Sequence, residues 1–148
     1  MLAHRVAGGA ADPDNADLPA GNAFAPASTG MAGVRIQSST NLISGGGDVT
    51  LRGKTNSNSA WYSGVMIYYN ANIHAGSGRL NMYGDASGTN ASYASGVQLA
   101  HGSWGATNRY TSTYSGEGPA INITGLAGAN AAGIEAGYYN TSWLNTTL

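Results

Sequence analysis

Cysteine is absent from this chain of 148 residues, and both charged residues and phenylalanine are scarce. Only 9% of the residues are charged, against about 25% in an average soluble domain. The lack of cysteine excludes disulfides, and a globular enzyme of this size would carry more Leu, Lys and Glu. Gly, Ala, Ser, Thr and Asn instead make up more than half of the chain. This composition favours turn-rich, repetitive β structure.

Charge and hydropathy exclude further classes. A formal net charge of −1 with 6 basic residues argues against a nucleic-acid surface. No apolar run approaches the ~18–20 residues that a membrane-spanning helix needs. The segment after Met1 lacks the apolar region of a secretion signal. We therefore expect either a cytoplasmic chain or a signal carried by sequence outside this piece.

An internal repeat of 31 residues runs through the chain, since residues 33–53 and 64–84 align without a gap. The matched residues are glycines, aliphatic residues and one Asn. They are Gly33, Val34, Ile36, Asn41, Leu42, Gly45, Gly47, Val49, Leu51 and Gly53, which fall on Gly64, Val65, Ile67, Asn72, Ile73, Gly76, Gly78, Leu80, Met82 and Gly84. A third copy begins at Gly96, is interrupted over roughly residues 102–115 and resumes at Gly118. A fourth copy begins at Gly133 and is incomplete at Leu148.

Apolar residues alternate with polar ones within each copy, which is the period of a β-strand. Gly-, Ser- and Asn-rich turns separate the strands, and glycines open the first strand and close the last. We interpret these glycines as corners with positive φ. One copy cannot bury its apolar side alone, so equivalent strands must stack in parallel about 4.8 Å apart. The predicted fold is all-β, a right-handed parallel β-helix (solenoid) of about three to four coils.

The alignment also predicts which residues stack. The inward columns are Val34–Val65–Val97, Ile36–Ile67–Leu99 and Leu51–Met82–Ile123. On the outer face, the alignment places Asn41 over Asn72, where their amides can form a ladder. It also places two pairs of opposite charge in register, Asp48 with Arg79 and Lys54 with Asp85.

Two regions follow from the repeat. Residues 1–32 do not share it and are rich in Ala, Gly, Asp and Pro, so we expect an irregular linker or edge segment with little regular structure. Residues 33–148 form the β-helix repeat segment, with coils that start near residues 33, 64, 96 and 133.

The glycine and aliphatic pattern of residues 33–53, 64–84 and, more loosely, 96–125 resembles the repeats of filamentous-haemagglutinin-like adhesins. These are large exoproteins of Gram-negative two-partner secretion systems. The resemblance implies a secreted, cell-surface rod that attaches to glycans or proteins on host or bacterial surfaces, with an outer-membrane transporter as the partner during secretion. The amino-terminal secretion domain of the family is not recognisable, so we expect an internal or truncated piece. The isolated piece is expected to self-associate end to end, because a cut stack exposes strand edges.

We expect no catalytic residue. A β-helical sugar-cleaving enzyme needs two or three convergent carboxylates. Asp48 and Asp85 occupy different repeat positions, Glu117 lies in a turn, and Glu135 lies in the last copy.

We also expect no metal site and no cofactor. The run Gly45–Asp48 resembles half of a calcium-binding repeat, but the next copy has Arg79 where Asp48 stood. His4, His74 and His101 are widely spaced and lack nearby ligand residues.

Aromatic residues are the candidates for contact with a ligand or partner, because Tyr and Trp with polar neighbours stack on sugars or anchor proteins. Trp104, Tyr110 and Tyr114 lie in the interrupted stretch of the third copy, and Trp61 and Tyr62 precede the second. The simpler interpretation is that these rings cover turns and shield the sheet.

Two alternatives to the adhesin remain open at this point. One is a β-helical carbohydrate-active enzyme, of the polysaccharide lyase or hydrolase type, or a phage receptor-binding fibre. The other is a truncated fragment without function.

Overall fold

A computed structural model describes residues 4–7, 10–11, 23–24, 32–37, 39–59, 62–99, 107–136 and 145–147. Every regular element in these ranges is a β-strand. The strands are β1 (His4–Ala7), β2 (Ala10–Ala11), β3 (Ala23–Phe24), β4 (Val34–Ile36), β5 (Asn41–Ile43), β6 (Val49–Lys54), β7 (Val65–Ile67), β8 (Asn72–His74), β9 (Leu80–Ala86), β10 (Val97–Leu99), β11 (Thr107–Thr111), β12 (Ile121–Ala127), β13 (Ile134–Ala136) and β14 (Asn145–Thr147).

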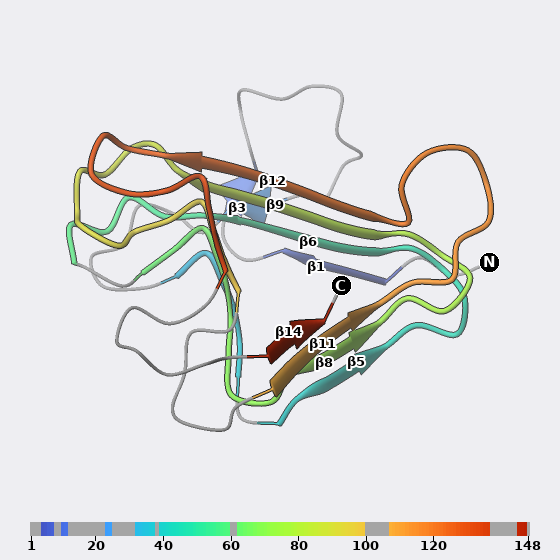
Figure 1. Cartoon of the computed structure of the whole chain (residues 1–148). Coiled ribbons are helices and arrows are strands. Elements are labelled where there is room, and N and C mark those ends of the chain that lie inside the picture. The colour runs from blue at the N-terminus through green and yellow to red at the C-terminus, as the bar shows by residue number, and fades with distance from the viewer. Residues whose placement is uncertain are drawn as a thin grey trace.

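Twelve of these strands form three parallel sheets of four (Figure 1). The sheets have the orders β1-β6-β9-β12, β4-β7-β10-β13 and β5-β8-β11-β14, and we name them the long, the short and the middle sheet. Each of the first three copies places one strand in every sheet, next to the equivalent strand of the neighbouring copy. The predicted all-β class and the predicted parallel pairing are therefore confirmed.

The predicted columns are confirmed by the strand register. Val65 pairs with both Val34 and Val97, and Met82 pairs with both Leu51 and Ile123. Inward residues of all three sheets belong to one buried cluster. A fully buried aliphatic side chain contributes roughly 1.5–3 kcal/mol, so these columns are the main stabilising contribution.

The third copy differs from its prediction, because its middle strand is present. Strand β11 lies within the stretch predicted to be an interruption, and Tyr110 pairs with Ile73 of β8. The offset between equivalent residues grows from 32 between β7 and β10 to 37 between β8 and β11 and 41 between β9 and β12. Extra residues therefore lie on both sides of β11, and the strand between them keeps its place in the stack.

Next to the first of these insertions, the side chain of Asn108 supplies hydrogen bonds to backbone groups of the second copy. Its buried side chain accepts a hydrogen bond from the Ala71 amide (2.9 Å) and donates one to the Ile67 carbonyl (3.2 Å). The side chain thus satisfies two backbone groups of the second copy at the corner between the short and middle sheets.

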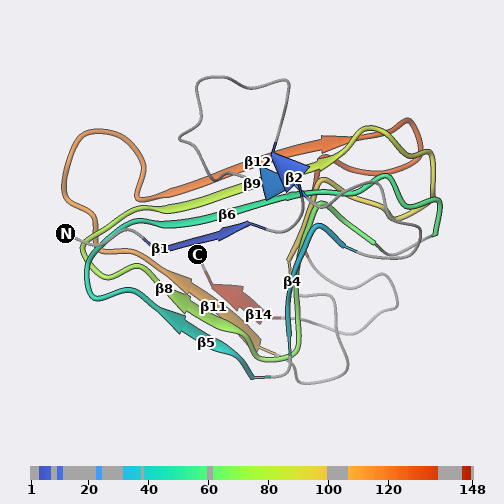
Figure 2. The same cartoon turned by 180° about the vertical axis from the view of Figure 1, so that it is seen from behind.

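The segment 1–32 contains more regular structure than the sequence predicts. Strand β1 extends the long sheet by pairing in parallel with β6, and β2 and β3 form a short antiparallel pair. β3 also contacts β6, and Figure 2 shows β1 beside β6. The sequence does not predict β1, because alternation of apolar and polar residues over only four positions is a weak signal of a strand.

The outer-face predictions are confirmed in part. Lys54 and Asp85 form an ion pair of 3.2 Å. Asp48 instead accepts a hydrogen bond from the backbone amide of Arg79 (2.7 Å). Asn41 does lie beside Asn72, but the described hydrogen bonds do not join their amides. On the long sheet, the Asn122 amide donates to the side-chain oxygen of Asn81 (2.9 Å).

The conserved spacing of glycines within the copies has a different cause from the predicted one. Among the described glycines, positive φ occurs at Gly46, Gly76 and Gly118, not at the glycines that open and close the copies. Those glycines lie where the end of a long-sheet strand meets the start of a short-sheet strand. A Cβ at Gly84 would overlap the carbonyl oxygen of Gly96, and a Cβ at Gly53 would overlap that of Gly64. The two backbones approach too closely for any side chain.

Replacing Gly84 with Ala tests this close approach. We expect Gly84→Ala to destabilise the chain by about 2 kcal/mol or more, because the added Cβ must push two backbones apart. Gly45→Ala is the matched control, since a Cβ there meets nothing within 4 Å and its change should stay within about 0.5 kcal/mol. Urea midpoints followed by circular dichroism measure both variants. Equal midpoints would contradict the close approach of the two backbones as the cause of the glycine spacing.

Asp85 makes stability depend on pH. Burial of the Asp85 carboxyl opposes its ionisation, but hydrogen bonds from Ser87 and the charge of Lys54 outweigh burial and lower its pKa. A group with a lowered pKa contributes stability above its ordinary pKa of about 3.9 and loses it as the pH falls through the folded value. We expect the urea midpoint of the wild type to fall more steeply below about pH 4 than that of Asp85→Asn. Parallel pH profiles of the two proteins would refute this role.

Candidate binding surfaces

The five aromatic residues proposed as contacts have different positions. Trp61 and Trp104 lie outside the described residues. Tyr62 is half-buried just before β7, and Tyr114 is half-buried in the loop that follows β11. Tyr110 lies in the buried cluster.

The prediction that Tyr110 contacts a ligand or partner is wrong, because only 2% of the residue is exposed. Its ring occupies the inward position that Leu42 and Ile73 hold in the first two copies. The sequence could not show this, because the insertions around β11 hide its alignment with the other copies. A ring at this depth stabilises the core and cannot contact a ligand directly.

Tyr114 belongs to an insertion, residues 112–120, that is fixed onto the second copy. Arg79 donates hydrogen bonds to the Tyr114 hydroxyl (2.7 Å) and to the carbonyl of Glu117 (2.6 Å). Its guanidinium also lies 4.3 Å from the centre of the Tyr114 ring. Thr113 adds a backbone hydrogen bond to the Gly76 carbonyl (2.6 Å). The loop therefore has an ordered, exposed tip held by a charged side chain beneath it.

Three tyrosines contact arginines of the same chain. Besides Arg79 and Tyr114, Arg35 lies 5.0 Å from the Tyr68 ring and Arg52 lies 4.8 Å from the Tyr83 ring. Tyr68 also donates a hydrogen bond to Gln37 (2.6 Å) and packs against Tyr69, with the ring centres 4.5 Å apart. The simpler interpretation, that these rings shield the sheets, therefore fits Tyr68, Tyr83 and Tyr114.

The outer face of the long sheet carries a shallow hollow of about 240 Å³. Hydroxyl and amide groups from three neighbouring strands line it, together with the Arg52–Tyr83 stack. These residues are Thr50, Asn81, Asn122 and Thr124.

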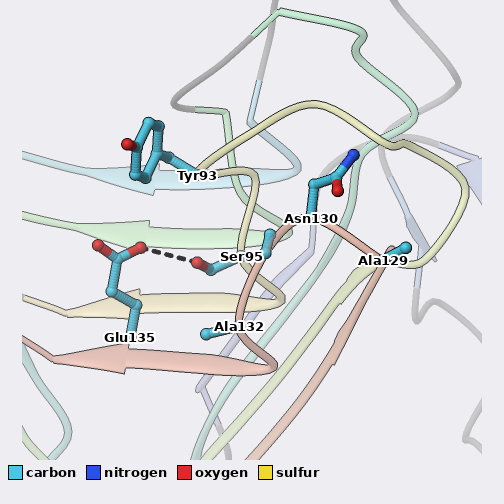
Figure 3. A pocket seen from close by; sticks show the side chains of 7 residues that line it. Tyr93, Ser95, Ala129, Asn130, Ala132 and Glu135 are labelled. Carbon is cyan, nitrogen blue, oxygen red and sulfur yellow. Dashed lines mark hydrogen bonds between the residues drawn. The ribbon is translucent and has the colours of Figure 1, made fainter.

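A larger groove, of about 560 Å³, lies beside the short sheet (Figure 3). Beyond the glycine crossings, the chain makes loops that project past the short sheet before each new copy begins, on the left of Figure 1. The loops that end the second and third copies and the edge strand β13 form the walls. The groove is lined by Tyr93, Ser95, Ala129, Asn130, Ala131, Ala132 and Glu135, and we name it the Glu135 groove.

Glu135 is held in this groove by hydrogen bonds from the neighbouring copy. Ser95 donates to its Oε2 (2.8 Å), and the Gln98 amide donates to the same oxygen (3.1 Å). The buried Ser63 donates to the amide oxygen of Gln98 (3.3 Å). This chain of donors fixes the orientation of the Gln98 amide and therefore the position of the Glu135 carboxylate.

Tyr93 and Asn130 complete the groove. Figure 3 shows the Tyr93 ring and the Glu135 carboxylate on the same side of the groove, with Ser95 between them and Asn130. Tyr93 has a φ of 62°, which is uncommon for a bulky residue. Asn130 donates to the carbonyl of Asn90 (3.0 Å), which ties the loop of one copy to that of the next.

The sequence analysis missed this groove, although one signal for it was present. The outward column of the short sheet is Arg35, Met66, Gln98 and Glu135, as the strand register shows. The same alignment that predicted the inward columns places Gln98 beside Glu135. The projecting loops have different lengths in each copy, so the sequence could not place Tyr93 or Asn130.

The acidic residues of the described chain are dispersed. Asp48 precedes β6, whereas Asp85 pairs with Lys54 at the other end of the long sheet, roughly 20 Å away at 3.3 Å per residue. Within the described residues, no three His, Cys, Asp or Glu side chains gather as metal ligands would.

No helix in the described part of the chain is long and apolar enough to cross a membrane.

Replacing Arg79 tests how the 112–120 loop is held. We expect Arg79→Met to speed amide hydrogen exchange in this loop, because its charged hydrogen bonds and ring contact are lost. Arg109→Met is the matched control, since Arg109 is exposed on the adjacent strand β11. Mass spectrometry of peptides spanning the loop measures the rates. Unchanged exchange in Arg79→Met would show that the contacts of Ser112 and Thr113 with the second copy are sufficient to hold the loop.

Comparisons with protein-family models, with curated proteins and with solved structures give no match to this chain.

Proposed function

We propose that this chain is a structural and adhesive segment of a secreted bacterial surface adhesin, built as a right-handed parallel β-helix. The observation that carries the proposal is the in-register stacking of three parallel sheets. Such stacking extends by simple addition of copies, which is how a long and rigid rod is made. The sequence resemblance to filamentous-haemagglutinin-like repeats supports the same function.

The outer surface supports a binding role. It combines hydroxyl, amide and tyrosine groups with few charges, as at the long-sheet hollow and the Glu135 groove. Loops held by a rigid framework are common sites of recognition. The partners are surface glycans or proteins of host cells or other bacteria.

Export is the second part of the proposal. The lack of cysteine is compatible with an exported bacterial protein. A display at the outer-membrane exterior, reached through a paired transporter, follows from the family resemblance. The chain performs no catalysis in this proposal, which the wide separation of Asp48 and Asp85 supports.

Adhesion is tested with beads that carry the purified chain at high density, because multivalent display amplifies weak contacts. Beads with the folded chain should be retained on epithelial or bacterial cells at least about tenfold more than beads with the heat-unfolded chain. A parallel incubation with polysaccharides should release no reducing sugar. Equal retention of the two kinds of bead would contradict the adhesive function, and sugar release would favour a β-helical enzyme.

A further inference from the structure

We propose that the Glu135 groove binds neutral or amino-sugar glycans and rejects acidic ones. This inference rests on the adhesive function, and it adds the class of ligand and the residues that select it. Three features of the groove carry it: its shape, the fixed carboxylate and the aromatic wall.

The shape fits an extended chain of small rings. Its volume of about 560 Å³ lies within the range of roughly 300–1,000 Å³ that small-ligand sites span. Three alanines, Ala129, Ala131 and Ala132, form part of the lining, so a flat ring can approach the backbone there. The groove is open to solvent, which lets a glycan longer than one sugar extend beyond it.

The carboxylate supplies the selective contact. Both donors that hold Glu135, Ser95 and Gln98, use the Oε2 atom, and no other described residue donates to Oε1. Oε1 points away from this bond in Figure 3 and can accept from a ligand hydroxyl or ammonium group. Hydrogen bonds to a charged acceptor are stronger than neutral ones. Because Glu135 is the sole charged residue among the described residues of the lining, a ligand carboxylate or sulfate would meet repulsion without a compensating cation from them.

The aromatic wall supplies apolar contact. Tyr93 lies on the same side of the groove as the Glu135 carboxylate (Figure 3). A tyrosine ring offers a flat apolar face for the C–H side of a pyranose and has little conformational freedom to lose. Asn130 lies on the far side, where its amide belongs to the polar rim. The groove therefore offers a ring face, a fixed acceptor and a small-residue floor, which together match a sugar better than an extended peptide.

The test is binding of the full chain to immobilised neutral, amino-sugar, sialylated and sulfated oligosaccharides. We expect the wild type to bind neutral or amino-sugar glycans at least about tenfold more tightly than acidic ones. Glu135→Gln keeps the shape of the side chain and should weaken binding of neutral or amino-sugar glycans about tenfold. The difference in affinity between these glycans and acidic ones should become smaller. Tyr93→Asn should weaken binding to all glycans, and Asn is chosen because it tolerates a positive φ.

Glu117→Gln is the control, since it removes an exposed carboxylate from the 112–120 loop, away from the groove. It should leave the profile unchanged, and melting curves confirm that every variant is folded. The proposal is overturned if no glycan binds, if acidic glycans bind best, or if Glu135→Gln and Tyr93→Asn behave like Glu117→Gln. Bead adhesion that survives both groove substitutions would refute the groove as the binding site and leave the adhesive function standing. Groove-dependent glycan binding without bead adhesion would refute the adhesive function and leave the groove as a glycan-binding site.

Discussion

Parallel backbone pairing between equivalent residues of successive copies is the interaction on which the rest of this structure depends. It fixes the spacing between copies, so side chains at equivalent positions meet directly and form columns. The pairing also sets a strict condition at the crossing of the long and short sheets. There two backbones touch, and only glycine leaves room, as at Gly53 against Gly64 and Gly84 against Gly96. The apolar columns supply most of the free energy, whereas the glycine crossings decide that the sheets can enclose one core.

The same pairing explains why insertions are tolerated in the third copy. Extra residues leave the stack on either side of β11, and the strand returns to the position that the second copy dictates. The irregularity is then absorbed by side chains. Asn108 replaces backbone partners at one corner, and Arg79 holds the 112–120 loop against the second copy at another. An insertion outside the pairing strands costs little, because loop closure depends weakly on length.

The outer surface has two kinds of aromatic residue with different physical roles. Tyr68, Tyr83 and Tyr114 stack on arginines of the same chain, so their faces are already occupied on one side. Tyr93 lines a groove together with the carboxylate of Glu135. The proposed binding thus depends less on the number of exposed rings than on where projecting loops leave a hollow beside a sheet. The groove lies where those loops meet the short sheet.

The sequence by itself determined the period, the parallel strands, the inward columns and the Lys54–Asp85 pair, because pairing at a constant offset turns a sequence alignment into spatial neighbours. The pairing of Gln98 with Glu135 follows from the same alignment but was not predicted. Only the tertiary structure decided that Tyr110 is buried and that Tyr93 and Glu135 line one groove. It also decided that the Arg79 guanidinium contacts Tyr114 and not the Asp48 carboxylate. These contacts involve insertions and loops whose lengths differ between copies. Where the offset is not constant, no rule of register applies, and packing in three dimensions selects the neighbours.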